Sequence, residues 1–284
     1  MSSPVPGPSD HLAASAAAAV RERWVGGPPI AIVLGSGLGD ALGSALTIEE
    51  TIDYADLPGF PTTGVPGHAG RLLLGALAEV PIAAFAGRFH LYEGHEPDVP
   101  ARIPRLAHAL GARTLVVTAA VGGLVPDLAE GTVVVVRDHV NMMGTTPLGG
   151  WRFPDGMPAF VDARTVYDPV LRALALERAA ALGIPCGEGV YAAMRGPAFE
   201  TPAEVEMLRR LGADVVGMSM VPESLPAHAL GLRVLGICSL TNAYGDHVTH
   251  EEVLRVSATT AAAIGRLLVD LFPRLPQTKE PDHG

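Results

Sequence analysis

The stretch IAIVLGSGLG, residues 30–39, joins five apolar residues to a loop that contains three glycines. The apolar part, Ile30–Leu34, has the length and β-branched composition of a buried strand. Glycines that follow such a strand let consecutive backbone N–H groups converge on an anion, and phosphate is the anion expected there. Taken alone, the loop is more typical of a tight turn than of a phosphate site. Its spacing matches neither the dinucleotide fingerprint nor the nucleoside triphosphate loop.

The same sequence pattern recurs along the chain, where short apolar runs alternate with segments of helical periodicity. The expected strands are Ile30–Leu34, Leu72–Gly75, Ile82–Ala86, Leu115–Thr118, Val133–Val136, Gly189–Ala192, Val215–Met218 and Val234–Leu240. The expected helices are His11–Trp24, Ala101–Leu110, Tyr167–Leu182, Pro202–Leu211, Glu223–Leu230 and Thr249–Leu271. This alternation predicts an α/β fold in which helices flank a mixed, mostly parallel central sheet, with ligands at the carboxyl ends of strands.

Length and local composition predict one large domain with two tails. The chain has 284 residues, a size that α/β folds often reach as one unit. Residues 1–9 are rich in Ser, Pro and Gly, and residues 273–284 combine Pro with charge, so we expect both ends to be disordered. The predicted domain covers residues 10–272. Residues 141–162 form a long Gly- and Pro-rich loop, which is typical of a functional segment or a subunit contact.

Charge and residue usage exclude several classes of function. The formal net charge of −10 opposes nucleic-acid binding, which needs a basic surface. Lys279, in the polar tail, is the single lysine, which makes a Schiff-base mechanism improbable. Cys186 and Cys238 lack the paired spacing of a metal or redox motif, so we expect reduced thiols, no metal and a cytoplasmic protein. No apolar run reaches the roughly 18 residues of a membrane span.

A second polar motif, GRFHLYEG at residues 87–94, follows a predicted strand end. It offers the guanidinium of Arg88, the imidazole of His90 and the phenol of Tyr92, and strand alternation would place the three on one face. A guanidinium can hold a phosphate through two parallel hydrogen bonds. Any one of these residues is more often a solvated edge residue. Three together, next to an anion loop, favour a binding site.

Six motifs in a fixed order make the chain resemble the trimeric class of purine nucleoside phosphorylases over most of the predicted domain. They are GSGLG at 35–39, VPGHAG at 65–70, GRFHLYEG at 87–94, GPAFET at 196–201, GMS at 217–219 followed by VPE at 221–223, and TN at 241–242. The resemblance implies a nucleoside phosphorylase fold with a partly barrel-like sheet. It also implies a homotrimer that cleaves 6-oxopurine nucleosides with orthophosphate in purine salvage.

The resemblance further implies a set of site residues. Its phosphate site consists of Ser36, His68, Arg88, the Ala120 backbone and Ser219. Its ribose site consists of Tyr92, Met218, His250 and, from a neighbouring subunit, Phe160. Its purine site consists of Phe199, Glu200 and Asn242. Catalysis would rest on Asn242, which stabilises charge at N7, on Glu200, which anchors the ring, and on His90, which aligns phosphate.

The charges that develop in this reaction can be stabilised without a cofactor. As the glycosidic bond stretches, the sugar gains positive and the purine negative charge, so the site must stabilise both and hold phosphate beneath C1′. Inorganic phosphate is a co-substrate and acts as the nucleophile. No covalent intermediate and no metal are required.

Two departures from the family pattern concern fine specificity. Ala119 stands where the family usually carries Asn, and Met220 replaces the commoner Thr. The nearest alternative is a methylthioadenosine phosphorylase-like activity on a 6-aminopurine, which typically has Asp in place of Asn242. A non-catalytic nucleoside binder and a dinucleotide-dependent oxidoreductase are the alternatives from other classes, and the loop spacing disfavours the oxidoreductase.

Overall fold

The structure is a computed structural model that describes residues 10–35, 38–65, 68–244 and 250–276. Its strands are β1 (Ile30–Leu34), β2 (Leu46–Asp53), β3 (Arg71–Leu77), β4 (Val80–Ala86), β5 (Thr114–Gly123), β6 (Val133–Asn141), β7 (Cys186–Ala193), β8 (Val215–Gly217) and β9 (Arg233–Asn242). Its α-helices are α1 (Asp10–Arg23), α2 (Leu38–Ala41), α3 (Arg102–Leu110), α4 (Pro169–Ala181), α5 (Pro202–Arg210), α6 (Val221–Ala229) and α7 (His250–Leu271). All expected strands and helices are present, and the α/β class is confirmed.

The sequence missed the edge strand β2 and misplaced the end of the ordered chain. Strand β2 pairs antiparallel with β3, but most of its side chains are exposed or half-buried, so it lacks an apolar run. Beyond the predicted boundary at residue 272, a 3-10 helix spans Phe272–Arg274 and Leu275 is buried. Two prolines and an arginine resembled a tail there, although Leu275 packs on the core. The predicted tail at residues 1–9, and residues 277–284, lie outside the described residues.

Part of the sheet closes into a ring, as the expected barrel-like character requires. The strands run in the order β2-β3-β4-β1-β5-β8-β7-β6-β9, and β9 also pairs with β5. The pairs β1–β4, β1–β5, β5–β9, β6–β7 and β7–β8 are parallel, and the others are antiparallel. Strand β5 is therefore shared between the open sheet and the ring.

Strand β5 has two successive neighbours along one edge. Strand β1 pairs with its residues 114–117, and β8 pairs with Gly122 and Gly123, while β9 follows the opposite edge. Residues 118–121 therefore have no strand partner on the first edge. The buried Thr118 partly fills this gap, because its hydroxyl donates to the Val33 carbonyl at 2.8 Å and accepts from the Gly35 N–H at 2.8 Å.

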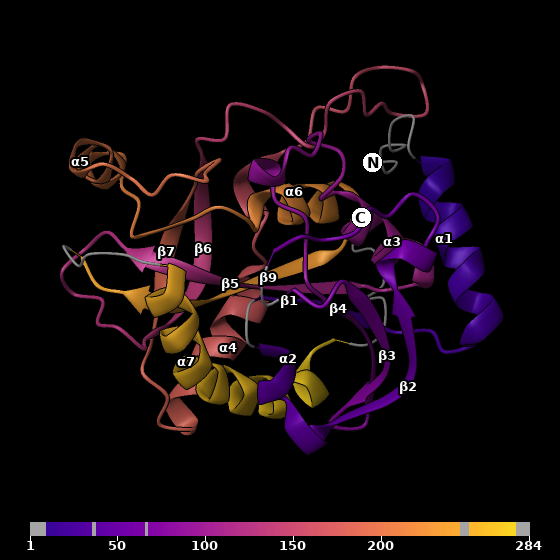
Figure 1. The fold of residues 1–284 in the computed structure, drawn as a ribbon, viewed down its shortest axis with the longest axis horizontal. Helices are drawn as coiled ribbons and strands as arrows, with labels where there is room; N and C mark the ends of the chain where they lie inside the picture. Colours follow the sequence, from indigo (N-terminus) through magenta and orange to yellow (C-terminus); the bar gives the residue numbers. More distant parts are fainter. Residues whose placement is uncertain (1–9, 36–37, 66–67, 245–249, 277–284) are drawn as a thin grey trace.

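Helices cover both faces of the sheet (Figure 1). Alternate residues of β1 serve two separate cores: Ala31 and Val33 belong to the core beneath α1, α3 and α6, and Ile30, Ile32 and Leu34 to the core beneath α4 and α7. Both faces of this strand are thus buried, as its uninterrupted apolar sequence predicts. Among the described helices, none combines the length and apolar character needed to cross a membrane.

The Thr118 bridge yields a stability prediction. Thr118→Val keeps the shape of the side chain but removes the partner of two buried backbone groups, so we expect a loss of about 2–4 kcal/mol in the free energy of unfolding, measured by urea denaturation. The control Thr118→Ser retains the hydroxyl and should lose only about 1 kcal/mol with its methyl group. Equal stability of the two variants would contradict the role given to the hydroxyl.

Candidate active site

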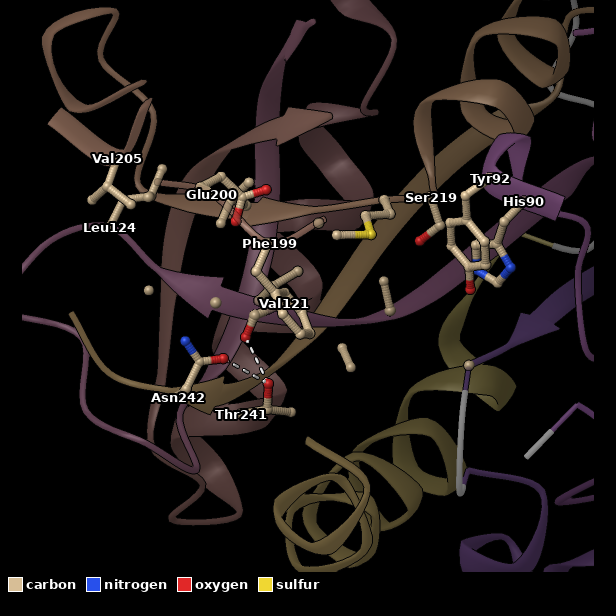
Figure 2. A pocket seen from close by; sticks show the side chains of 18 of the residues that line it. His90, Tyr92, Val121, Leu124, Phe199, Glu200, Val205, Ser219, Thr241 and Asn242 are labelled. Atoms are coloured by element: carbon tan, nitrogen blue, oxygen red, sulfur yellow. Dashed lines mark hydrogen bonds between the residues drawn. The ribbon is translucent and has the colours of Figure 1, made fainter. Parts of the chain in front are cut away.

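A cavity of about 400 Å³ lies where β1 and β8 diverge from β5. Segments that are far apart in sequence line it. Its lining comprises Gly35, Val65, His68, Arg88, His90, Tyr92, residues 119–124, Phe199, Glu200, Pro202, Val205, residues 216–219 and residues 241–244. Figure 2 shows two polar groups in this pocket: His90, Tyr92 and Ser219 lie together on one side, and Glu200, Thr241 and Asn242 on the other.

The first polar group is built around a close approach of His68 to the segment after β4. Gly87 has φ +117, and a Cβ there would lie 2.9 Å from the His68 Cβ, so only glycine fits. The His68 Nδ1 lies 3.4 Å from the Arg88 backbone nitrogen, and the rings of His68 and His90 stack with centroids 5.1 Å apart. The buried Tyr54 donates to the Gly87 carbonyl at 2.9 Å and fixes this turn.

Arg88 is almost completely buried at the floor of this group. The residue is 1% exposed, and one terminal nitrogen donates to the Thr118 carbonyl in the gap of β5. Its other terminal nitrogen lies 3.4 Å from the carboxylate of Glu223, which is also 1% exposed. Arg88, the one arginine or lysine among the described residues that line the cavity, therefore has an anionic partner of its own.

His90 is oriented by Glu93. The Glu93 Oε1 accepts from the His90 backbone N–H at 2.8 Å and lies 3.2 Å from the His90 Nδ1, while Oε2 accepts from the Gly64 N–H at 3.2 Å. Donation by Nδ1 to a carboxylate leaves the Nε2 atom of His90 for a ligand. The Tyr92 ring stacks on the His90 ring at 4.6 Å.

The convergence of Arg88, His90 and Tyr92 has a different origin from the one expected. Strand β4 ends at Ala86, and His90 caps a 3-10 helix at Leu91–Glu93. The prediction that strand alternation aligns these side chains is therefore wrong. The expected grouping nevertheless holds, because all three residues line the cavity.

Burial keeps both histidines uncharged, whereas hydrogen bonds keep Glu93 ionised. Burial, with help from the charges of His90 and Arg88, lowers the pKa of His68 to about 3. Burial also lowers the pKa of His90, against the opposing effect of its hydrogen bond to Glu93. Burial alone would raise the pKa of Glu93, but hydrogen bonds from His90 and Gly64 hold this pKa at about 2.

Ser219 lies at a strained turn. Met220 has φ +66 and ψ −56, and the Val221 N–H donates to the Ser219 carbonyl at 2.8 Å, which makes a γ-turn of the strained kind. The Ser219 backbone N–H donates to the Tyr191 hydroxyl at 3.1 Å. Tyr191 contacts both the backbone and the side chain of Ser219 and so fixes this residue at the edge of the cavity.

The second polar group, Glu200, Thr241 and Asn242, can form hydrogen bonds with the edge of a planar heterocycle. The Thr241 hydroxyl lies 3.1 Å from the Val121 carbonyl oxygen and 3.2 Å from the Asn242 Oδ1, and these two acceptors share its one proton (Figure 2). This contact leaves the Asn242 amide nitrogen as a donor on the opposite side. A Cβ on Gly122 would lie 3.0 Å from that nitrogen, so glycine lets the amide lie flat against β5. Burial raises the pKa of the nearby Glu200 carboxyl.

Between the two polar groups, the thioether of Met218 and the ring of Tyr92 form the cavity wall. A Cβ on Gly196 would lie 2.4 Å from the Met218 Sδ and 3.2 Å from the Tyr92 Cδ1, so the chain passes directly over both side chains. Such surfaces suit the apolar face of a sugar. Phe199 is 46% exposed at the mouth of the cavity and is available for stacking.

Most residues predicted for the site meet in this cavity. They are His68, Arg88, His90, Tyr92, Ala120, Phe199, Glu200, Met218, Ser219 and Asn242. Ser36 and the side chain of His250 lie outside the described residues. Phe160 is 81% exposed and does not line the cavity of its own chain. In the described part of the chain, no group of three His, Cys, Asp or Glu side chains could hold a metal ion.

Sequence reasoning missed several residues that shape the site. Glu93 and Glu223 belong to two of the six motifs, and Thr241 directly precedes Asn242. The sequence alone indicated no role for any of the three. Thr118 is the last residue of a predicted strand, and no sequence pattern marked it as part of the site. Their contacts depend on pairings between distant segments, which no local pattern shows.

The fold and the cavity define a member of the phosphorylase superfamily, whose family model matches residues 29–273. The chain is 41% identical to purine nucleoside phosphorylase 1 of Bacillus subtilis over 257 residues, which cover 89% of this chain and 94% of the relative. It belongs to the purine nucleoside phosphorylases, and it is a pentosyltransferase.

Solved structures of the same family resemble it closely. A Schistosoma purine nucleoside phosphorylase in complex with hypoxanthine has a TM-score of 0.86 and 32% identity, with 96% of this chain and 99% of that chain covered. The Schistosoma mansoni enzyme in complex with adenosine has a TM-score of 0.85 and 33% identity, with 94% and 98% covered.

The neutral state of His68 predicts a pH dependence of stability. Because folding lowers its pKa from 6.5 to about 3, only the unfolded chain binds this proton between those values, and its contribution to stability is lost as pH falls from 6.5. His68→Asn should flatten the fall of unfolding free energy between pH 6 and pH 4 by up to about 1.4 kcal/mol per pH unit, measured by urea denaturation without phosphate. Parallel pH curves for variant and wild type would show that His68 titrates normally.

Proposed function

We propose that this protein splits 6-oxopurine nucleosides with orthophosphate as the nucleophile, releasing the free base and a pentose 1-phosphate. One observation carries the proposal: a single cavity has an arginine, two histidines and a serine at one end and Glu200 with Asn242 at the other. The stretch between them is lined by Tyr92 and Met218, which suits a pentose. Family membership supports the same reaction.

The two ends of the cavity act on opposite charges. A phosphate oxygen attacks C1′ while the C1′–N9 bond breaks, and the bonding pair leaves with the purine. The amide nitrogen of Asn242 donates to the charge that develops on the base, and Glu200 accepts from the ring N1–H. Since the groups are fixed before reaction, little reorganisation opposes the step.

Phosphate binding rests on directed hydrogen bonds. Arg88 and the hydroxyl of Ser219 donate to phosphate oxygens, and the Nε2 atom of His90 shares the phosphate proton. Glu93 holds the His90 ring in one tautomer, since Nδ1 faces its carboxylate at 3.2 Å. The backbone of Ala120, in the unpaired stretch of β5, adds a further contact. The reaction needs no metal or organic cofactor, because phosphate itself brings the nucleophile.

The preference for a 6-oxopurine rests on the direction of the Asn242 amide. With Thr241 donating to Oδ1, the amide nitrogen is the group left to meet the base, and it suits O6 or N7 as acceptor. The related Schistosoma mansoni enzyme was solved in complex with adenosine, so binding alone does not separate 6-amino from 6-oxo substrates. The preference must therefore be judged from the rate of cleavage.

Base release from a panel of nucleosides tests the function directly. Inosine and guanosine should yield free base only when phosphate is present, and adenosine and methylthioadenosine should react at least about tenfold more slowly. Faster cleavage of the 6-amino substrates would overturn the specificity. Tight guanosine binding without any base release would mark the chain as a binder.

A single exchange should redirect the specificity. Asn242→Asp replaces the donor by an acceptor, so we expect kcat/KM for inosine to fall about 10²-fold and the adenosine-to-inosine ratio to rise. The control Asn242→Ala removes the donor without adding an acceptor and should lower both activities. If the alanine variant changed the ratio as much as the aspartate variant, hydrogen bonding by residue 242 would not set the preference.

We further propose a cytoplasmic homotrimer in which Phe160 completes the ribose site of a neighbouring subunit. Phe160 is 81% exposed and Met157, in the same loop, is 57% exposed, which is unusual for large apolar side chains. A stacking partner at the ribose would bring one more apolar wall to the pocket.

Subunit mixing tests this arrangement. Phe160→Ala should raise KM for inosine roughly tenfold, whereas Val170→Ala, on the exposed face of α4, should not. Mixing Phe160→Ala subunits with Asn242→Ala subunits should restore complete sites, because each supplies what the other lacks. An active monomer in sedimentation, or no recovery on mixing, would contradict the cross-subunit role.

A further inference from the structure

The ion pair of Arg88 and Glu223 is the least expected feature of the site. The side chains of Arg88 and Glu223 are 2% and 1% exposed, and the closest nitrogen–oxygen distance is 3.4 Å. A buried ion pair loses much of its attraction to the cost of removing two charges from water, and apolar residues of similar size often stabilise a protein as well or better. Stability is therefore a weak explanation for this pair.

Glu223 reaches Arg88 from a separate structural element. It lies in the first turn of α6, directly after the strained residue Met220, whereas Arg88 follows β4. The N-terminus of a helix favours a carboxylate there. In the described part of the chain, Arg88 is the only cation within ion-pair distance of Glu223.

Arg88 is held from two sides. The Thr118 carbonyl accepts a hydrogen bond from one terminal nitrogen, and the Glu223 carboxylate lies 3.4 Å from the other as an ion pair without a hydrogen bond. Thr118 is itself fixed by its hydroxyl contact to β1. The guanidinium is thus positioned before any ligand arrives, and its placement depends on Glu223 and on the gap in β5.

The pair also sets the net charge of the phosphate end. Burial lowers the pKa of both His68 and His90, so neither ring adds a positive charge near neutral pH. Arg88 contributes the one cation among the described lining residues at this end, and Glu223 balances it. Burial raises the pKa of Glu223 while the charge of Arg88 opposes this rise, and with Glu223 ionised the described floor of the site is formally neutral.

Neutrality matters because phosphate loses negative charge as it attacks. An uncompensated buried arginine would stabilise the free dianion more than the transition state, in which part of that charge has passed to the sugar. Such a site would bind phosphate more tightly and react more slowly.

We propose that Glu223 is a positioning residue that fixes the Arg88 guanidinium and cancels its charge, so that bound phosphate keeps its nucleophilicity. The proposal rests on the proposed function, because it assumes that Arg88 contacts phosphate. It assigns to the Val221-Pro222-Glu223 motif a role in turnover.

Two variants separate charge from position. Glu223→Gln keeps the size and one acceptor but removes the charge, so KM for phosphate should fall about three- to tenfold and kcat should fall by a similar factor. Glu223→Asp keeps the charge but withdraws it from Arg88, so KM for phosphate should rise. A merely structural residue would give the same direction of change in both variants.

Phosphate binding without nucleoside provides the second readout. Calorimetric titration of inorganic phosphate into the nucleoside-free protein should give a lower dissociation constant for Glu223→Gln than for wild type. As a control, Asp168→Asn breaks the pair with Arg233, whose closest contact is 2.6 Å, at the start of α4, and it should lower stability without changing KM for phosphate.

The outcomes are distinct for the proposal and for the function. A wild-type protein that releases base without phosphate would refute the function itself. A phosphate-dependent wild type whose Glu223→Gln variant shows unchanged or raised KM for phosphate would refute the role of Glu223 alone. Failure of both Glu223 variants to fold would assign the pair to stability and likewise contradict the proposal.

Discussion

The active site depends on how strand β5 is shared. A strand has two edges, and β9 occupies one of them along almost the whole of β5. The other edge serves β1 first and β8 later, because the open sheet and the closed ring diverge there. Backbone groups of residues 118–121 therefore need other partners. Arg88 donates to the Thr118 carbonyl and the Thr241 hydroxyl to the Val121 carbonyl, while the Thr118 hydroxyl bridges to Val33 and Gly35 at the end of β1. The remaining space becomes the cavity.

The gap also explains the electrostatic character of the site. A buried carbonyl in the gap attracts the Arg88 guanidinium, and the buried guanidinium in turn requires a counter-charge, which Glu223 supplies. With two neutral histidines beside this pair, the proposed selectivity for phosphate would come from the direction of hydrogen bonds more than from net charge. A protein with a formal charge of −10 can then bind an anion at one local point.

The sequence predicted the layers of the fold better than their closure. Apolar runs such as Ile30–Leu34 mark buried strands because both of their faces are covered, and this strand was predicted with its exact bounds. The predicted strands Leu115–Thr118 and Val133–Val136 end five residues before β5 and β6 do, where the apolar pattern stops. Strand β2 exposes most of its side chains, so it carries no such pattern. The ring depends on the pairing of β5 with β9 and β8, whose residues are more than ninety positions apart, and local periodicity contains no information on it.

The site shows the same division. Residues in the motifs that carry the family resemblance, such as Arg88 and Asn242, were expected in the site, and both line the cavity. The residues that hold them, Thr118, Glu93 and Glu223, act through contacts that only the folded chain creates. The strand alternation assumed for residues 88–92 failed, because the chain turns into a 3-10 helix there.

Direct displacement by a phosphate held in the gap of β5 is the central claim, and isotopic labelling tests it most directly. Inosine would be turned over with phosphate in which every oxygen is ¹⁸O, and the ribose 1-phosphate would be analysed by mass spectrometry and ³¹P NMR. The account predicts that the sugar phosphate retains all of these labelled oxygens, including the one bonded to C1′. An unlabelled oxygen between C1′ and phosphorus, or release of free ribose, would contradict it.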